Sequence, residues 1–133
     1  MHRVNIALHE LFSALSDPYR IRIVRLILEA KDELCLCELS DALDEPEYKL
    51  SRHVKILKSV GLLKSVRDGK WIYHSLVKNH NYLKAILKAI AMFPDPDNLT
   101  QTDFARFRKR VVKRSNGRCT VPARVLEVTE KRA

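Results

Sequence analysis

Two cysteines, Cys35 and Cys37, stand one residue apart in the stretch ELCLCELSDAL, residues 33–43. Thiolates are soft ligands that prefer thiophilic ions, such as arsenic(III), antimony(III), cadmium, lead or copper(I), to magnesium or calcium. Side chains at this spacing point to nearly opposite sides of an α-helix but to the same side of an extended chain. The pair can therefore chelate one ion only where the following helix has not begun or is unwound.

Apolar residues recur at helical spacing in five stretches around this pair. The predicted helices cover about residues 4–15, 18–28, 36–43, 46–60 and 82–93. Asp17 can cap the second helix, and Pro18 suits its first turn. Within residues 62–76 the apolar period becomes alternating, and Asp68-Gly69 between two such runs predicts a tight β-hairpin. The expected fold class is mainly α with a small β-hairpin.

The composition indicates a polyanionic partner, nucleic acid above all. A net charge of +9 and a pI near 9.7 favour such a partner because clustered Lys and Arg displace counterions from phosphates. The Pro- and Asx-rich PDPDN marks a boundary between a domain of residues 1–93 and a basic C-terminal extension of residues 94–133. We expect a cytoplasmic protein with no membrane segment, because signal-peptide features and long apolar runs are lacking and the odd cysteine number suits a reducing compartment.

The order of the predicted elements is typical of a winged helix-turn-helix. In that design the second helix of the pair enters the major groove, and the hairpin contacts the neighbouring backbone. Ser51, Arg52 and His53 lie in the N-terminal half of the second helix, where side chains reach base edges. The other candidate DNA contacts are Tyr48 and four basic residues suited to phosphates, Lys49, Lys55, Arg67 and Lys70.

Residues 16–76 resemble the ArsR/SmtB family of metal- and metalloid-responsive repressors. The resemblance is carried, in this order, by ALSDPYRIRIVRLIL, ELCLCELSDAL, KLSRHVKILKSVGLL and RDGKWIYHSL. It implies a homodimeric repressor that binds double-stranded operator DNA and releases it when a toxic ion binds. The family's dimer interface uses the first and last helices, which here correspond to residues 4–15 and 79–92.

The cysteine motif is similar to the ELCxCDL of the family's arsenic and cadmium sensors. This implies that Cys35 and Cys37 are metal ligands, with arsenic(III) or antimony(III) as the inducer. The best-known arsenic sensors have a third cysteine where this sequence has Ser40. Because arsenic(III) typically takes three thiolates, either two suffice or Cys119 supplies the third, from the same chain or the partner. Cadmium and lead remain alternative inducers, although the N-terminal cysteines of those sensors are absent.

Other classes of function are kept beside this one. In a redox- or persulfide-sensing repressor, Cys35 or Cys37 would pair with Cys119. An enzyme is not expected, because the sequence lacks a Gly-rich phosphate loop, a C-x-x-C and paired carboxylates in a cleft-like context. An architectural protein without an inducer would bind operator and random DNA alike. In the extension, residues 106–118 are either a solvated run or additional phosphate contacts.

Overall fold

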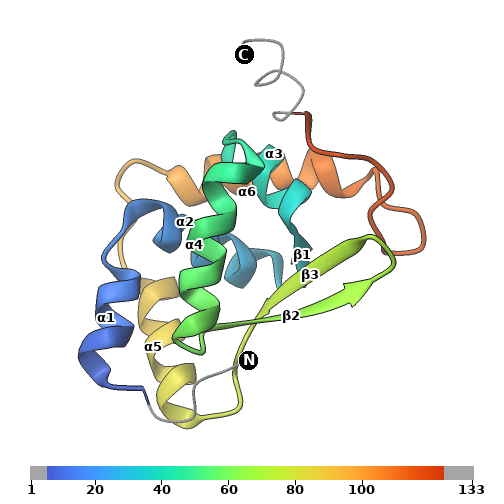
Figure 1. Ribbon diagram of the computed structural model, residues 1–133. Helices are drawn as coiled ribbons and strands as arrows, with labels where there is room; N and C mark the ends of the chain where they lie inside the picture. The colour runs from blue at the N-terminus through green and yellow to red at the C-terminus, as the bar shows by residue number, and fades with distance from the viewer. Residues whose placement is uncertain (1–5, 125–133) are drawn as a thin grey trace.

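The computed structural model describes residues 6–124, which form six helices and three strands. The elements are α1 (Leu8–Leu15), α2 (Pro18–Ala30), β1 (Leu34–Cys35), α3 (Leu36–Leu43), α4 (Glu47–Ser59), β2 (Leu63–Asp68), β3 (Trp71–Leu76), α5 (Asn81–Met92) and α6 (Leu99–Val111). Figure 1 shows α4 across the front of a helical body, with β2 and β3 projecting from it as a hairpin. The start of the predicted first helix, Val4, lies outside the described residues.

The helices α2, α3 and α4 enclose the hydrophobic core. Leu26, Leu39 and Leu50, one from each helix, are fully buried in it. The start of α2 follows the predicted local chemistry, because the Asp17 carboxylate accepts hydrogen bonds from the backbone N–H groups of Tyr19 and Arg20, at 2.8 and 3.3 Å. Only residues 44–46 separate α3 from α4, which is the short connection of a helix-turn-helix pair.

The hairpin belongs to a three-stranded antiparallel sheet in the order β1-β3-β2. Asp68 pairs with Trp71, so the two turn residues are Gly69 and Lys70 rather than the predicted Asp68-Gly69. Gly69 has a φ of +64°, and glycine takes this conformation at little cost at the first central position of a tight hairpin turn. The sequence did not predict β1, whose two residues pair with the middle of β3.

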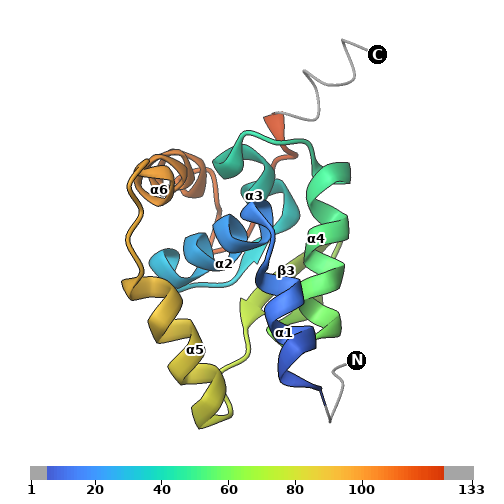
Figure 2. The ribbon, with the colours of Figure 1, turned by 90° about the vertical axis from the view of Figure 1, so that its left-hand side faces the viewer.

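The last helix, α6, packs on the outer side of α2 and α3. Figure 2 shows it at the end of the molecule opposite to α1 and α5. Its contact side carries buried Phe107 together with Asp103, whose carboxylate forms an ion pair with Arg22 of α2 at 2.8 Å. None of the helices within residues 6–124 has the length and apolar character needed to cross a membrane.

Candidate metal centre and DNA-binding face

Three cysteine side chains meet at the start of α3. Cys35 is the last residue of β1 and has an extended backbone (φ −83°, ψ 164°), whereas Cys37 lies in the first turn of α3. The Sγ atoms of Cys35, Cys37 and Cys119 all lie within 4.8 Å of one another, and those of Cys37 and Cys119 are 3.7 Å apart. All three cysteines are buried and free. The helix thus begins between the two neighbouring cysteines, which lets both sulfur atoms face one point.

Cys119 reaches this point within the same chain, through a tight turn after α6. Ser115 and Arg118 form an antiparallel bridge around Asn116 and Gly117, which both have positive φ, 51° and 75°. This pair of conformations is the one that Asn-Gly favours in a two-residue hairpin turn. The Cys119 backbone N–H then donates a hydrogen bond to the Tyr73 hydroxyl at 2.8 Å. Tyr73 is also the β-sheet partner of Cys35, so one residue of β3 helps to position two of the thiols.

The segment that carries Cys119 is held against the winged helix-turn-helix by ion pairs of two arginines, Arg114 and Arg118. The Arg114 guanidinium forms a bidentate ion pair with Glu38 of α3, with both N–O distances 2.6 Å. Glu38 is fully buried, so this pair lies in the protein interior. Arg118 pairs with Glu33 before β1 and with Asp68 at the tip of β2, at 2.5 and 3.0 Å. The position of Cys119 is therefore determined by contacts made before any ion binds.

These contacts change the interpretation of the basic run at residues 106–118. The arginines whose guanidinium groups form ion pairs or hydrogen bonds with other parts of the protein are Arg106, Arg110, Arg114 and Arg118. The basic residues of the run that stay exposed are Arg108, Lys109 and Lys113. The run is thus neither a simply solvated tail nor a uniform phosphate-binding surface. The four-residue spacing of the inward arginines was the available sequence signal for this packing.

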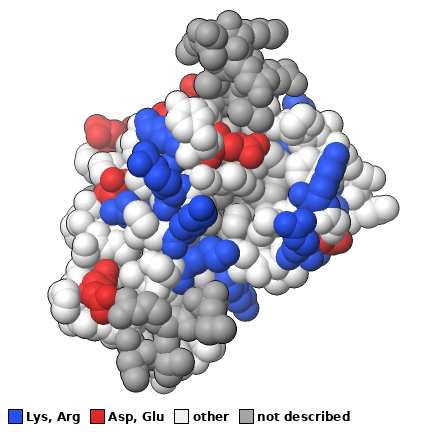
Figure 3. All heavy atoms as spheres, viewed as in Figure 1, with Lys and Arg blue, Asp and Glu red and all other residues white. Residues whose placement is uncertain are grey.

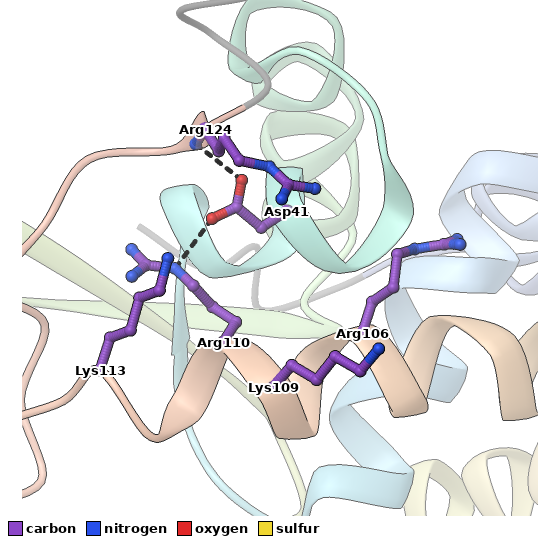
Figure 4. A pocket seen from close by; sticks show the side chains of 6 residues that line it. All are labelled: Asp41, Arg106, Lys109, Arg110, Lys113 and Arg124. Atoms are coloured by element: carbon purple, nitrogen blue, oxygen red, sulfur yellow. Dashed lines mark hydrogen bonds and ion pairs between the residues drawn. The ribbon is translucent and has the colours of Figure 1, made fainter.

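A third arginine, Arg110, lies beside the thiols themselves. Its Nε is 3.0 Å from an Asp41 carboxylate oxygen, and its Nη2 donates to the Val121 carbonyl oxygen at 2.6 Å. Figure 4 shows Asp41 between Arg110 and the backbone of Arg124, at the edge of a basic pocket of about 120 Å³. The same guanidinium is within hydrogen-bonding reach of Cys37. Arg110 therefore supplies a buried positive charge next to the cysteine cluster.

The surroundings give the three thiols different proton affinities. Hydrogen bonds from Cys119 and Cys35, together with the nearby Arg110 guanidinium, lower the pKa of Cys37 to about 4 despite its burial. Hydrogen bonds with Cys119 and Cys37 are the largest cause of the raised pKa of Cys35, and burial of this thiol raises the pKa further. For Cys119, the hydrogen bond with Cys35 lowers the pKa, but contact with Cys37 and burial outweigh it and raise the pKa overall. Of the three sulfur atoms, that of Cys37 therefore has the surroundings that most favour the thiolate form.

Ser40, which stands at the position of the family's third cysteine, forms a hydrogen bond within the helix-turn-helix instead. It is fully buried within α3, and its hydroxyl donates a hydrogen bond to the Glu45 carbonyl oxygen at 2.5 Å. This bond helps to end α3 at the turn that leads into α4. The three-sulfur arrangement depends on Cys119 instead.

The outer side of α4 presents several of the predicted DNA contacts. Tyr48, Arg52 and Lys55 are exposed, and Ser51 is half-buried beside them. Figure 3 shows Lys and Arg side chains gathered on this face in two groups, one over the helices around α4 and one at the hairpin. This face has the positive charge that a helix entering the major groove requires.

Two predicted contacts of α4 are held against α2 instead. The His53 ring stacks on Tyr19, with 5.6 Å between ring centroids, and its Nδ1 lies 3.0 Å from an Arg20 guanidinium nitrogen. The Lys49 ammonium donates to Glu45 and to the Tyr19 hydroxyl, at 2.9 Å each. Both residues help to position α4 on α2.

The hairpin contributes the remaining predicted contacts. Arg67 on β2 and Lys70 in the turn are both exposed, and the Lys70 ammonium lies 5.1 Å from the centroid of the Trp71 ring. Arg118 adds a third cation near this hairpin through its ion pair with Asp68. The sequence interpretation missed Arg118, because its proximity to the hairpin arises only from the tertiary path of residues 112–119.

Comparisons with known proteins place this architecture among transcription regulators. A helix-turn-helix domain family matches residues 15–66. A helix-turn-helix-type transcriptional regulator of Methanocaldococcus jannaschii is 33% identical over 81 residues, 61% of this chain and 88% of that protein. The arsenical resistance operon repressor of Escherichia coli is 43% identical over 67 residues, 50% of this chain and 56% of the repressor. A homologue of the cadmium resistance regulatory protein CadC from Staphylococcus aureus is 34% identical over 71 residues, 53% of this chain and 58% of its own length.

The helix-turn-helix pair, the basic face of α4 and the β-hairpin define a winged helix-turn-helix regulator. Since most of the Methanocaldococcus jannaschii regulator is matched, and arsenic, SmtB-type and cadmium regulators are also similar to the chain, the chain belongs to the ArsR/SmtB family of repressors. The chain spans little more than half the length of the arsenical and cadmium relatives. The family and the winged helix-turn-helix fold predicted from the sequence are thereby confirmed.

Proposed function

We propose that this protein is a cytoplasmic repressor that binds operator DNA as a homodimer and releases it when Cys35, Cys37 and Cys119 bind arsenic(III). The observation that carries the proposal is the meeting of three buried sulfur atoms within 4.8 Å at the first turn of the helix-turn-helix. Three thiolates are the ligand set that suits the pyramidal geometry of arsenic(III) or antimony(III). The similarity to an arsenical resistance operon repressor supports the same inducer.

The position of the cysteines provides a route from ion binding to DNA release. Cys37 belongs to α3, which packs on α4, and the Cys35 backbone N–H donates to Glu38 at 3.1 Å to hold the first turn. Three arsenic–sulfur bonds require the sulfur atoms at fixed positions, so the first turn of α3 must adjust. Any movement of α3 is passed to α4, because the two helices share the core. The ion then favours a conformation in which α4 fits the groove less well.

For the DNA complex we propose base-edge contacts from Arg52 and Ser51, supported by Tyr48 and Lys55. The exposed Arg67 and Lys70 of the hairpin are proposed to contact phosphates. His53 and Lys49 are also predicted DNA contacts. To reach DNA, each would first have to give up its contact with Tyr19, which for His53 is ring stacking and for Lys49 a hydrogen bond. Their contribution to DNA affinity is therefore expected to be smaller than that of Arg52.

Exposed apolar side chains support a dimer through α1 and α5. Leu8 and Phe12 of α1 are 62% and 55% exposed, and Tyr82 and Met92 of α5 are 57% and 73% exposed. These large side chains lie on two helices at the same end of the molecule (Figure 2). Burying them against a second copy would remove apolar surface from water and align two copies of α4 for successive half-sites.

The proposal is tested with a fluorescein-labelled DNA fragment from immediately upstream of the protein's own coding sequence. Fluorescence anisotropy is followed under full reduction while arsenite, antimonite, cadmium, lead or zinc is added. Arsenite is expected to release the wild-type protein, but not Cys35→Ser/Cys37→Ser or Cys119→Ser. The exposed substitution Val112→Ala is the matched control for Cys119→Ser and should leave release unchanged.

The alternatives give different results in the same assay. Release by cadmium or lead but not by arsenite makes the protein a divalent-ion sensor, as the similarity to the cadmium resistance regulator would favour. Release by mild oxidant without any ion would indicate a redox sensor, for which the 3.7 Å Cys37–Cys119 distance offers a pair. Equal affinity for the upstream fragment and for random DNA would rule out a specific repressor.

A further inference from the structure

A basic pocket of about 120 Å³ lies between α3, α6 and the segment that follows Cys119. Its lining residues include Asp41 of α3, three basic residues of α6 and the last described residue, namely Arg106, Lys109, Arg110 and Arg124. Figure 4 shows Lys109 on α6 below Asp41 and Arg124 on the C-terminal segment above it. The pocket therefore combines cations from two parts of the chain.

The ion pair between Asp41 and Arg110 forms one wall of the pocket. The Asp41 carboxylate oxygen lies 3.0 Å from Arg110 Nε, and the Arg110 side chain is only 4% exposed. The same carboxylate accepts a hydrogen bond from the Arg124 backbone N–H at 2.8 Å, and Arg110 Nη2 donates to the Val121 carbonyl oxygen at 2.6 Å. This pair thus holds residues 121–124 at the pocket, and its arginine offsets the one negative charge of the lining.

The cations that face the pocket exceed the carboxylates that could neutralise them. Arg106 shares the Asp103 carboxylate with Arg22, at 3.0 and 2.8 Å. Among the residues that the structure describes, the side chains of Lys109 and Arg124 have no carboxylate partner. The helix dipole favours basic residues in the last turn of α6, which accounts for Lys109 but not for Arg124. Uncompensated positive charge brought together from two segments favours an anionic ligand.

We infer that this pocket binds a free tetrahedral oxyanion with two negative charges, of the class of inorganic phosphate and sulfate, between Lys109 and Arg124. Arginine recognises such oxygen atoms through paired N–H donors, and lysine does so as a compact charge. The pocket volume is well below the 300 Å³ or so at which sites for drug-sized molecules begin, so a small anion fits better than a nucleotide. The inference is independent of the ion proposed for the three cysteines.

The place of the pocket in the fold favours a free anion over a phosphate of DNA. Both α4 and α6 pack on α2, and Figure 2 shows them on opposite sides of it. Among the described residues that line the pocket, none is a contact predicted for DNA on α4 or the hairpin. The pocket is therefore separate from the face that these two elements present.

The bound anion is expected to stabilise the fold. Arg106, Lys109 and Arg110 follow one another at spacings of three and four along α6, where like charges repel each other. A dianion between Lys109 and Arg124 reduces this repulsion and joins α6 to the segment of residues 121–124. Since the unfolded chain lacks the pocket, binding to the folded form raises its stability by mass action.

Inorganic phosphate is the probe for this site. It is titrated into the reduced full-length protein at pH 7.5 by isothermal titration calorimetry, with KCl keeping the ionic strength constant. The expected Kd is about 1 mM or lower, with one anion per chain. Phosphate at ten times this concentration should raise Tm by about 4 °C. Sulfate should act in the same way, whereas nitrate at the same ionic strength should have little effect.

Two double substitutions test whether the pocket cations hold the anion. Lys109→Gln/Arg124→Gln removes two of them and is expected to weaken phosphate binding by at least about tenfold. Arg108→Gln/Lys88→Gln removes the same number of charges at exposed positions outside the pocket and is the matched control. Equal losses in the two variants, or equal stabilisation by phosphate and nitrate, would overturn the inference.

DNA binding distinguishes a free anion from a backbone phosphate. Fluorescence anisotropy of the upstream DNA fragment is measured against KCl concentration for the same two variants. The slope of the logarithm of the binding constant against the logarithm of salt concentration is expected to be equal in both. A slope that is flatter by about 1 to 2 units in Lys109→Gln/Arg124→Gln alone would identify a DNA phosphate as the occupant and overturn the free anion as the ligand.

Discussion

The unequal proton affinities of the three thiols determine how pH acts on ion binding. The lowered pKa of Cys37 and the raised pKa values of Cys35 and Cys119 favour a resting cluster with one thiolate, on Cys37, and two thiols. Formation of a neutral arsenic tris-thiolate from As(OH)₃ consumes one proton from solvent and releases three waters. Formation of a cadmium tris-thiolate from Cd²⁺ releases two protons. The sign of the proton exchange therefore distinguishes the two candidate inducers.

We predict opposite pH dependences for the two ions between about pH 6 and 8. Arsenite affinity should fall by about tenfold per pH unit as pH rises, and cadmium affinity should rise by about a hundredfold per unit. Isothermal titration calorimetry in two buffers of different ionisation enthalpy gives the number of protons exchanged. Arsenite binding without net proton uptake would show that Cys37 is protonated in the resting protein, because three thiols then supply the three protons with which the hydroxides of As(OH)₃ leave as water.

His74 couples the stability of the hairpin to pH. It is buried on β3, its Nδ1 lies 2.7 Å from the Ser65 hydroxyl oxygen, and burial together with the charge of Lys58 lowers its pKa to about 4. The unfolded chain, with a histidine pKa near 6.5, binds the proton more readily. The stabilisation is therefore complete above about pH 6.5 and is lost as pH falls toward 4.

We expect this histidine to account for about 3 kcal/mol of the free energy of unfolding across that window. Urea unfolding at pH 7.5, 6 and 5 should show a steeper loss for the wild-type protein than for His74→Gln. The exposed His80→Gln is the control and should follow the wild-type curve. Parallel curves for the wild-type protein and His74→Gln would show that His74 stays protonatable in the fold.

At the scale of the elements, the position of residues 112–119, which carry Cys119, depends on the buried ion pair between Arg114 and Glu38. The two side chains are only 8% and 1% exposed, so removing one partner leaves the other as an uncompensated buried charge. We expect Arg114→Met to lower the free energy of unfolding by about 3–5 kcal/mol and to weaken arsenite binding through the displacement of Cys119. Urea unfolding and arsenite titration measure the two effects.

The double substitution Glu38→Met/Arg114→Met tests whether the stability lost in Arg114→Met comes from the uncompensated buried charge of Glu38 or from lost packing. Because two apolar side chains can replace a buried pair with little cost, most of the lost stability should return. Lys113→Met, an exposed neighbour, is the control and should change neither quantity. A double variant as unstable as Arg114→Met would mean that the segment depends on hydrogen bonds of Arg114 other than those to Glu38.

The sequence predicted the elements whose signals are local. The cap at Asp17 and the apolar periods of α2, α4 and α5 each lie within one stretch of chain, and they were predicted nearly to the residue. Strand β1 was missed because two residues carry no period, and their conformation depends on pairing with β3. The packing of α6 was missed because a basic run has the same composition whether its arginines face water or buried carboxylates.

The candidate metal site, too, could be predicted from the sequence only where its signals are local. The spacing of Cys35 and Cys37 already required an extended residue before the helix, and the structure has one. That Cys119 comes from the same chain could not be predicted, because its position depends on Arg114 and Arg118 reaching acidic residues about 80 positions away. Arg110, which sets the charge beside Cys37, was likewise hidden in the basic run.

At the scale of the whole molecule, the proposed dimer makes DNA affinity depend on the surface of α1. Phe12→Asp places a charge among the exposed apolar side chains of α1 without touching the core. We expect this variant to sediment as a monomer and to lose at least about tenfold in operator affinity, because one half-site then binds alone. Val112→Asp, at the exposed position that follows α6, is the control for sedimentation. A dimeric Phe12→Asp variant would place the interface elsewhere.

The 82-residue separation between Cys37 and Cys119 has a consequence for chain topology. An ion bound to both sulfur atoms closes a loop that contains α4, the hairpin, α5 and α6, much as a disulfide would. In the chain-entropy description, a loop of this length disfavours the unfolded state by about 4.5 kcal/mol. Occupancy would then slow the opening of the C-terminal segment, so limited proteolysis should cut the ion-free protein there first and spare the ion-bound form. The proposed inducer would thus protect this segment from proteolysis in addition to weakening operator binding.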